Sequence, residues 1–202
     1  MLKPLYLASQ SPRRLELLRQ IGLAPAVLRL RSGAERLDVD ETPLPEEPAF
    51  EYVLRLARLK AAAGERARRG RRLADWPIVA ADTTVTLDGR ILGKPVDEAE
   101  AAAMLRAYSG RAHSVLTGVA VAFRGRLELA VSESTVTFRG LSEAEIAAYV
   151  ASREPFDKAG GYGIQGRAAL FVEHLAGSYS GVMGLPLFET AELLREVGFP
   201  VL

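Results

Sequence analysis

Residues 78–92, Ile-Val-Ala-Ala-Asp-Thr-Thr-Val-Thr-Leu-Asp-Gly-Arg-Ile-Leu, decide the fold class of this 202-residue chain. The apolar residues 78–81 predict a buried strand that ends at Asp82. Two further apolar segments flank Asp88-Gly89, a dipeptide typical of the two-residue turn of a β-hairpin. The stretch therefore predicts a strand followed by a hairpin, with a register that brings Lys94 opposite Thr83.

Predicted strands and helices alternate on both sides of this stretch. We expect strands at residues 5–8, 27–30, 115–123, 127–138 and 168–175, and helices at 12–21, 51–69, 97–108, 142–152 and 186–197. The polar, Pro-rich residues 32–48 and the Gly-rich residues 154–166 are expected to be loops. Strands and helices mixed in this way, with a second hairpin around residues 124–125, indicate an α/β or α+β fold with a mixed sheet.

The composition excludes several classes of protein. The 26 Lys and Arg residues nearly balance the 25 Asp and Glu residues, and a net charge of +1 argues against broad nucleic-acid binding. The chain has no cysteine, which excludes disulfides, thiolate nucleophiles and Cys-ligated zinc. Its two histidines cannot form a three-His metal site, so a metal would be held mainly by carboxylates, as Mg²⁺ or Mn²⁺ are.

Neither a membrane-spanning run nor a secretory cleavage pattern is present in the sequence, and we therefore expect a cytoplasmic protein. Basic residues do cluster at 66–72, which contain five arginines. This cluster fits either a nucleic-acid patch or a solvated helix end, where cations are favoured by the helix dipole. The second interpretation is favoured because the chain as a whole is nearly neutral.

Lysine is rare, since only Lys3, Lys60, Lys94 and Lys158 stand among the 26 basic residues. Three of these four lysines lie in or near segments that other features single out. A compact ammonium differs from a planar guanidinium in reach and in hydrogen-bonding geometry. The skew alone indicates a GC-rich genome or a hot habitat, and if background lysines have drifted to arginine, the remaining lysines mark positions where arginine would not serve.

Residues 9–14, Ser-Gln-Ser-Pro-Arg-Arg, join a predicted strand to a predicted helix. Ser11 is placed as the N-cap and Pro12 as the first helical residue, so free backbone N–H groups gather there. Arg13 and Arg14 occupy the first turn, where the helix dipole disfavours cations unless an anion is bound. The segment predicts a phosphate site, and the alternative is an ordinary solvated first turn.

Asp82 and Lys94 are brought together by the predicted hairpin at its open end. A carboxylate at the end of an apolar strand lies where ligands often bind in α/β proteins. Strict alternation would place the two side chains on opposite faces, so Gly93 or Pro95 must bend the chain if both meet one ligand. The alternative is a purely structural Asp–Lys pair.

Residues 157–166 form a Gly-rich loop that also carries Asp157, Lys158 and Gln165. The spacing G-x-G-x-x-G is present, but a dinucleotide-binding function is rejected because a strand, and no helix, is predicted after it. The loop is more consistent with a segment that closes over a polar ligand, with Gln165 facing a base edge. His113 fits either a phosphate contact or a structural hydrogen bond, and His174 is expected to be structural or exposed.

Six segments in this order resemble the Maf family of nucleoside triphosphate pyrophosphatases: residues 7–14, 80–83, 92–95, 109–113, 154–166 and 184–186. The resemblance implies hydrolysis of a nucleoside triphosphate between Pα and Pβ, which yields the monophosphate and pyrophosphate. It implies an elongated, two-lobed Maf/ITPase-like α/β fold with a mixed twisted sheet, flanking helices and an active site in the cleft between the lobes. Residues 1–202 would then form a single Maf-like domain, and a homodimer is expected.

The resemblance also implies the roles of individual residues. Asp82 corresponds to the proton acceptor, and Glu41 and Asp82 to the ligands of a divalent cation, Mg²⁺ or Mn²⁺. Lys94 and Glu41 join Asp82 as catalytic positions. The substrate-binding positions are Ser9, Arg13, Arg14, Lys60, Thr83, Asp157, Lys158 and Gln165, of which Arg13, Thr83 and Gln165 are tied to the choice of base.

The loop at residues 157–166, with residues 177–179, resembles the branch that acts on dTTP and UTP, including 5-modified pyrimidines. One alternative is the same chemistry on 7-methyl-GTP or on another non-standard nucleotide such as ITP. The other alternative is a non-catalytic nucleotide sensor or septation regulator. We expect a nucleoside triphosphate as the partner, and neither nucleic acid nor membrane.

Overall fold

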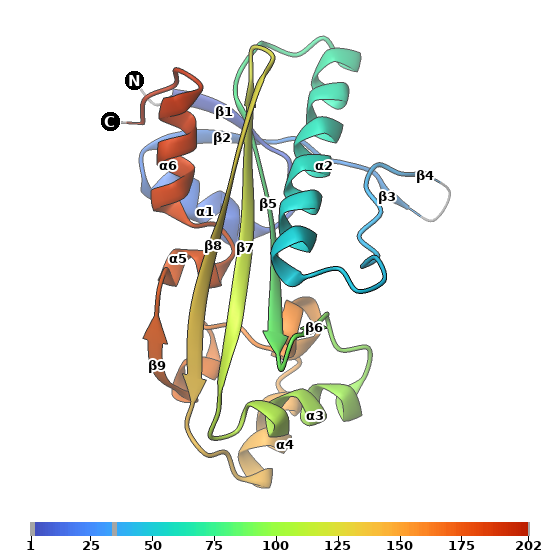
Figure 1. Ribbon diagram of the computed structural model, residues 1–202, viewed down its shortest axis with the longest axis vertical. Helices are drawn as coiled ribbons and strands as arrows, with labels where there is room; N and C mark the ends of the chain where they lie inside the picture. Colours follow the sequence, from blue (N-terminus) through green and yellow to red (C-terminus); the bar gives the residue numbers. More distant parts are fainter. Residues whose placement is uncertain (1–2, 34–35, 202) are drawn as a thin grey trace.

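A computed structural model of the chain describes residues 3–33 and 36–201, and its framework is a seven-stranded mixed sheet (Figure 1). The strands are β1 (Lys3–Leu7), β2 (Leu23–Val27), β5 (Ile78–Leu87), β6 (Arg90–Leu92), β7 (Ala112–Phe123), β8 (Arg126–Phe138) and β9 (Val172–Ala176). Their order is β2-β1-β5-β7-β8-β9, and β6 pairs with β5. β1 is parallel to β2 and β5, and the other pairs are antiparallel, so the predicted mixed α/β sheet is confirmed.

Helices cover both faces of the sheet. They are α1 (Pro12–Gln20), α2 (Ala49–Gly70), α3 (Glu98–Tyr108), α4 (Glu143–Ala151), α5 (Tyr179–Met183) and α6 (Leu187–Glu196). Alternation along β5 sends Ile78 and Ala80 into the core beneath α2, and sends Val79 and Ala81 into the core beneath α1 and α6. Full burial of a side chain as large as that of Ile78 or Val79 stabilises the fold by about 1.5–3 kcal/mol.

A third core lies at the other end of the long strands, which run along most of the elongated molecule (Figure 1). There Val85 and Leu87 of β5 pack with α3, α4 and the loop that follows α4. This loop contains three short 3₁₀ helices, at Glu154–Asp157, Ala159–Gly161 and Arg167–Leu170. The pocket described below lies between this core and the two cores around α2, α1 and α6.

Gly118 allows α2 to lie unusually close to the sheet. A Cβ atom at this position would stand only 2.4 Å from the carbonyl oxygen of Val53, so even alanine would collide with the backbone of α2. Gly118 is the register partner of Asp82 on the neighbouring strand. The close approach therefore brings α2, and with it Lys60, within reach of Asp82.

The first hairpin has the predicted register, with Val85 opposite Leu92 and Leu87 opposite Arg90, and the second hairpin is also confirmed. The predicted position of Lys94 opposite Thr83 is wrong, because β6 ends at Leu92 and its pairing with β5 stops there. In the first hairpin, Asp88 and Gly89 have φ angles of 52° and 76°, as a type I′ turn requires. The N-cap of α4 is confirmed as a full capping box between Ser142 and Glu145.

The remaining predictions about elements were less accurate. The strand predicted at residues 27–30 lies at Leu23–Val27 and includes a proline, which an edge strand tolerates. The strand predicted at 168–175 is wrong over its first half, where Arg167–Leu170 form a 3₁₀ turn. Glu154 accepts a hydrogen bond from the backbone N–H of Arg167 and so favours the turn. The loop predicted at 32–48 contains two short paired strands, β3 (Ser32–Gly33) and β4 (Arg36–Leu37), and residues 34–35 lie outside the described residues.

The Arg-rich end of α2 carries local ion pairs. Glu65 pairs with Arg68 at 2.8 Å and with Arg69 at 2.6 Å, and Arg68 also reaches Asp75 at 3.2 Å. These contacts are those of a solvated helix end. None of the helices in the described ranges is long and apolar enough to cross a membrane.

Candidate active site

The site forms where the edge of β5 has no neighbouring strand. Along this edge β1 pairs with Ile78 and Val79, and β6 pairs with residues 85–87. Between them, over residues 80–84, the register assigns β5 no partner on this side within the described part of the chain. The prediction that the strand ends at Asp82 is therefore wrong, because β5 is continuous, but Asp82 does lie at an open edge of the sheet.

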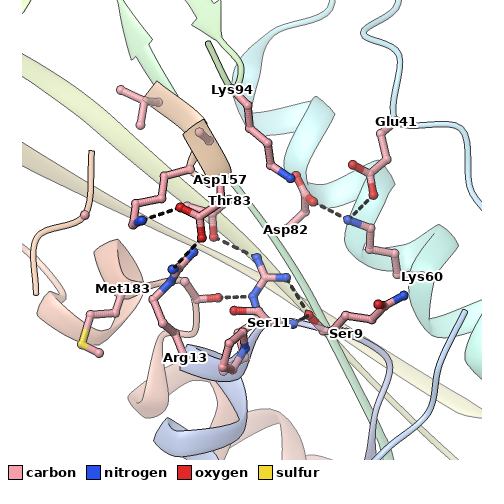
Figure 2. Close-up of a pocket in the computed structure, with 18 of the residues that line it drawn as sticks. Ser9, Ser11, Arg13, Glu41, Lys60, Asp82, Thr83, Lys94, Asp157 and Met183 are labelled. Carbon is pink, nitrogen blue, oxygen red and sulfur yellow. Dashed lines mark hydrogen bonds and ion pairs between the residues drawn. The ribbon is translucent and has the colours of Figure 1, made fainter. Parts of the chain in front are cut away.

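A pocket of about 860 Å³ surrounds this open edge. This volume is typical of sites that bind small molecules. Asp82 and Thr83 point to opposite faces of β5, yet both line the pocket because it wraps around the free edge. Every substrate-binding and catalytic residue predicted from the sequence lines it: Ser9, Arg13, Arg14, Glu41, Lys60, Asp82, Thr83, Lys94, Asp157, Lys158 and Gln165. Figure 2 shows most of them converging from separate segments of the chain.

On one face of β5, Lys60 of α2 connects two carboxylates. Its Nζ atom lies 2.6 Å from Asp82 Oδ1 and 2.7 Å from Glu41 Oε1 (Figure 2). The Asp82 side chain is 11% exposed and that of Glu41 58%. The Tyr52 hydroxyl donates to the Glu41 carbonyl oxygen at 2.9 Å and so holds the loop against α2. Burial, together with the charges of Asp82 and Glu41, raises the pKa of Tyr52 to about 12.

Lys94 enters the same side of the pocket from beyond the end of β6. That strand ends at Leu92, and the backbone N–H of Gly160 donates to the Gly93 carbonyl at 2.9 Å. The chain therefore leaves the strand at Gly93, as the alternation argument requires. Figure 2 shows the Lys94 side chain pointing toward Asp82.

On the opposite face of β5, Arg14 is half-buried and lies among neutral acceptors. Its guanidinium donates to the Gly184 carbonyl at 2.7 Å and to the hydroxyls of Ser9 and Thr83 at 3.2 Å each. Burial lowers the pKa of Arg14, an effect that the charge of Asp82 opposes. The predicted phosphate contact of Arg14 stays a prediction. The guanidinium also has a structural role, because it links Ser9, Thr83 and Gly184 in this wall of the pocket.

Arg13 spans the pocket toward the Gly-rich loop. Its Nη1 atom lies 3.5 Å from Asp157 Oδ2, and Asp157 also pairs with Lys158, whose ammonium donates to the Glu154 carbonyl at 2.8 Å. Partial burial opposes ionisation of Asp157, but the contacts with Lys158 and Arg13 hold its pKa below the usual value. At the start of α1, Ser11 makes no side-chain cap, so the first turn keeps N–H groups available to an anion.

His113 lies outside the pocket, so the structural alternative for this residue holds and the phosphate contact does not. It is 4% exposed, and its Nε2 atom shares a 2.7 Å hydrogen bond with the Tyr162 hydroxyl. Burial lowers the pKa of His113 to about 4, so the ring is neutral near pH 7. His174, on β9, is exposed, as expected.

The donor set suits a hard divalent cation that arrives with phosphates. Glu41 and Asp82 both offer carboxylate oxygens within hydrogen-bonding distance of one Lys60 ammonium. Within the described ranges, no group of three or more His, Cys, Asp or Glu residues is placed to hold a metal. Mg²⁺ is commonly bound by one or two carboxylates plus substrate phosphates, and a two-carboxylate site fits that pattern.

Sequence reasoning missed several residues that shape the site. Thr117, on the neighbouring strand β7, shares a 2.9 Å hydrogen bond with Thr83. Tyr52 positions the loop that carries Glu41, and Gly118 allows α2 to lie close to the sheet. The adjacent Thr117 and Gly118 interrupt the apolar residues 115–123 of β7, and this interruption was the sequence feature that could have indicated both residues. A polar residue at such a position needs a specific partner.

The pocket places cations and two carboxylates around an open strand edge, beside the start of a helix. Such an arrangement is suited to a phosphorylated small molecule, with a carboxylate able to act as an acid or base. The sequence comparisons agree with this class. The profile described as "Maf-like protein" matches residues 4–197, and the chain belongs to this family.

Two curated relatives are named "dTTP/UTP pyrophosphatase". The protein of Aromatoleum aromaticum is 55% identical over 98% of this chain and 97% of its own length. The protein of Dechloromonas aromatica is 55% identical over 96% of this chain and 98% of its own length. Among solved structures, the Staphylococcus aureus Ham1 protein aligns with a TM-score of 0.42 and 19% identity, over 67% of this chain and 71% of that one.

Proposed function

We propose that this chain is a nucleoside triphosphate pyrophosphatase that hydrolyses dTTP and UTP to the monophosphate and pyrophosphate. The near full-length relatives with this name support the substrate class. The observation that carries the proposal is the Asp82 carboxylate, held at 2.6 Å by Lys60 at the open edge of β5 and faced by Lys94. A carboxylate fixed among cations, in a pocket large enough for a small molecule, is suited to activating water.

In this mechanism Asp82 accepts a proton from a water molecule. The water oxygen bonds to Pα, the bond between Pα and the oxygen bridging to Pβ breaks, and pyrophosphate leaves with that oxygen. Phosphoryl chemistry of this kind depends on positioning and charge neutralisation more than on covalent catalysis. Lys94 and Arg13, which line the pocket, would neutralise the phosphates, and the N-terminal turn of α1 would add backbone donors.

Glu41 and Asp82 would hold a divalent cation, Mg²⁺ or Mn²⁺. When bound, such a cation neutralises phosphate charge and lowers the pKa of coordinated water. Lys60 then balances the two carboxylates: its ammonium contacts both in the described structure and keeps them close together. Chelation with EDTA should stop turnover, and added Mg²⁺ or Mn²⁺ should restore it.

The remaining pocket residues would select the nucleotide. Gln165 is exposed at the pocket wall and offers both a donor and an acceptor to a base edge. Arg13 and Thr83 would complete the contacts that distinguish bases, and Lys158 with Asp157 would fix the loop that carries Gln165. A cytoplasmic location and a homodimer stay predictions.

A panel of nucleotides scored by pyrophosphate release tests the proposal. With Mg²⁺, dTTP and UTP should give the highest kcat/KM, above CTP, ITP and 7-methyl-GTP. Preferred turnover of 7-methyl-GTP or ITP would assign the chain to the alternative substrate class. Tight nucleotide binding without pyrophosphate release would indicate a sensor and overturn the proposed activity.

A further inference from the structure

Thr117, beneath the pocket on β7, has a hydroxyl whose hydrogen bonds can be assigned a direction. Thr117 is 0% exposed. The Thr117 Oγ1 atom lies 2.8 Å from the Gly181 carbonyl oxygen and 2.9 Å from Thr83 Oγ1. A carbonyl can only accept, and two oxygens this close would repel each other without a shared proton. The single Thr117 proton therefore points to Gly181, and Thr117 must accept from Thr83.

Thr83 consequently has a fixed polarity. Its proton is committed to Thr117, and one of its two lone pairs accepts from Arg14 Nη2 at 3.2 Å. Donors and acceptors thus run in one direction, from Arg14 through Thr83 and Thr117 to Gly181. Thr83 also lines the pocket. One lone pair of its hydroxyl oxygen stays available there to accept a hydrogen bond from a ligand.

We infer that Thr117 is a positioning residue for substrate selection, which fixes the Thr83 hydroxyl as a hydrogen-bond acceptor for a ring N–H of the nucleotide base. An acceptor-only hydroxyl disfavours a phosphate oxygen and favours a donor. Uracil and thymine carry N–H at ring position 3, whereas cytosine has a bare acceptor nitrogen there. The inference rests on the proposed dTTP/UTP activity and names the contact by which cytosine would be rejected.

Thr117→Val tests this inference because it removes the acceptor while keeping a branched side chain of similar shape. The Gly181 carbonyl keeps its 2.9 Å bond from the Gly184 N–H, so no buried group is orphaned. The freed Thr83 proton would turn into the pocket and face the base N–H. We expect the kcat/KM ratio of UTP over CTP to fall about tenfold or more. The change should lie mainly in the KM for UTP, because the base contact is present in both ground and transition states.

Two further variants separate positioning from packing. Thr117→Ser keeps the hydroxyl and should restore the wild-type ratio. Thr190→Val is the matched control, because Thr190 is also 0% exposed and donates to a backbone carbonyl, that of Pro186, but does not line the pocket. It should leave the ratio unchanged. Thermal melts of all three variants report whether the fold is intact.

A double-mutant cycle provides the decisive readout. If Thr117 acts through Thr83, then Thr117→Val should not alter the UTP/CTP ratio in a Thr83→Val background. An equal loss for UTP and CTP, an unchanged ratio, or an additive double variant would overturn the inference. These outcomes differ from failure of the proposed function, in which the wild-type protein itself would release no pyrophosphate from dTTP or UTP.

Discussion

The two faces of β5 at neighbouring residues present different chemistry to one pocket. On the α2 side, Asp82 joins an ionic chain through Lys60 to Glu41, a side chain that is 58% exposed. On the α1 side, Thr83 joins a hydrogen-bonded chain in which the half-buried Arg14 guanidinium donates to neutral oxygens. The first side consists of charged groups, whereas the second joins one half-buried guanidinium to uncharged acceptors in a fixed geometry.

This difference follows from strand alternation at an unpaired edge. In a paired strand, residues 82 and 83 would serve separate surfaces, but here the pocket wraps around the edge and both contribute to it. One side can then be tuned for charge and proton transfer, while the other is tuned for hydrogen-bond polarity. We therefore expect that kcat and nucleotide selectivity can be changed independently by substitutions on the two sides.

Asp82→Asn should have the largest effect, because an amide cannot accept the proton of water near neutral pH. We expect kcat to fall by about 10³-fold or more while dTTP binding is largely kept. Pyrophosphate release and calorimetric binding measure the two quantities. Asp88→Asn, in the exposed hairpin turn, is the matched control. Undiminished turnover by Asp82→Asn would show that Asp82 is not the proton acceptor.

Lys94→Arg should lower kcat by about 10-fold to 100-fold with little change in Tm, since a guanidinium has a different shape and reach from an ammonium. Lys3→Arg is the control, because Lys3 is bonded only to the Pro200 carbonyl among the described contacts. A fully active Lys94→Arg enzyme would mean that the scarcity of lysine reflects composition alone.

Arg14→Lys tests the ordered side through stability. Lysine cannot reproduce three hydrogen bonds from one planar group, and about 2 kcal/mol of stability should be lost. For a chain of this size, Tm should fall by about 4–8 °C in a calorimetric scan. Arg19→Lys, an exposed position on the same helix, should leave Tm unchanged. A Tm for Arg14→Lys equal to that of Arg19→Lys would show that this wall is not held by Arg14.

Gln165→Ala should have the smallest effect, lowering the kcat/KM preference for dTTP and UTP over CTP by up to about tenfold. The reason is the loss of one exposed amide facing the base edge. Gln20→Ala, outside the pocket, serves as the comparison. Identical ratios in both variants would exclude Gln165 from base selection.

Local patterns predicted much of this molecule. The Asp88-Gly89 turn fixed the hairpin register, and the Ser142–Glu145 capping box marked the start of α4. These features depend on residues close together in the chain, where turn chemistry and capping act directly. The resemblance to a known family then supplied Glu41 and Lys60, which no local pattern indicated.

Long-range pairing explains what the sequence could not predict. The open edge at Asp82 exists because β1 pairs with β5 only as far as Val79, and β6 pairs with β5 only from Val85 onward. No pattern within residues 78–84 indicates either limit. The polarity of Thr83 depends on a carbonyl in α5, at Gly181. In the same way, the turn at Arg167–Leu170 depends on a Glu154 carboxylate that lies earlier in the chain.

Nucleotide selectivity measured side by side in Lys94→Arg and Thr117→Val tests the separation of the two faces most directly. We expect Lys94→Arg to lower kcat for UTP and CTP by the same factor and to leave their kcat/KM ratio unchanged. We expect Thr117→Val to lower that ratio about tenfold or more, with a smaller change in kcat. A shifted ratio in Lys94→Arg together with an unchanged ratio in Thr117→Val would contradict the separate roles of the two faces.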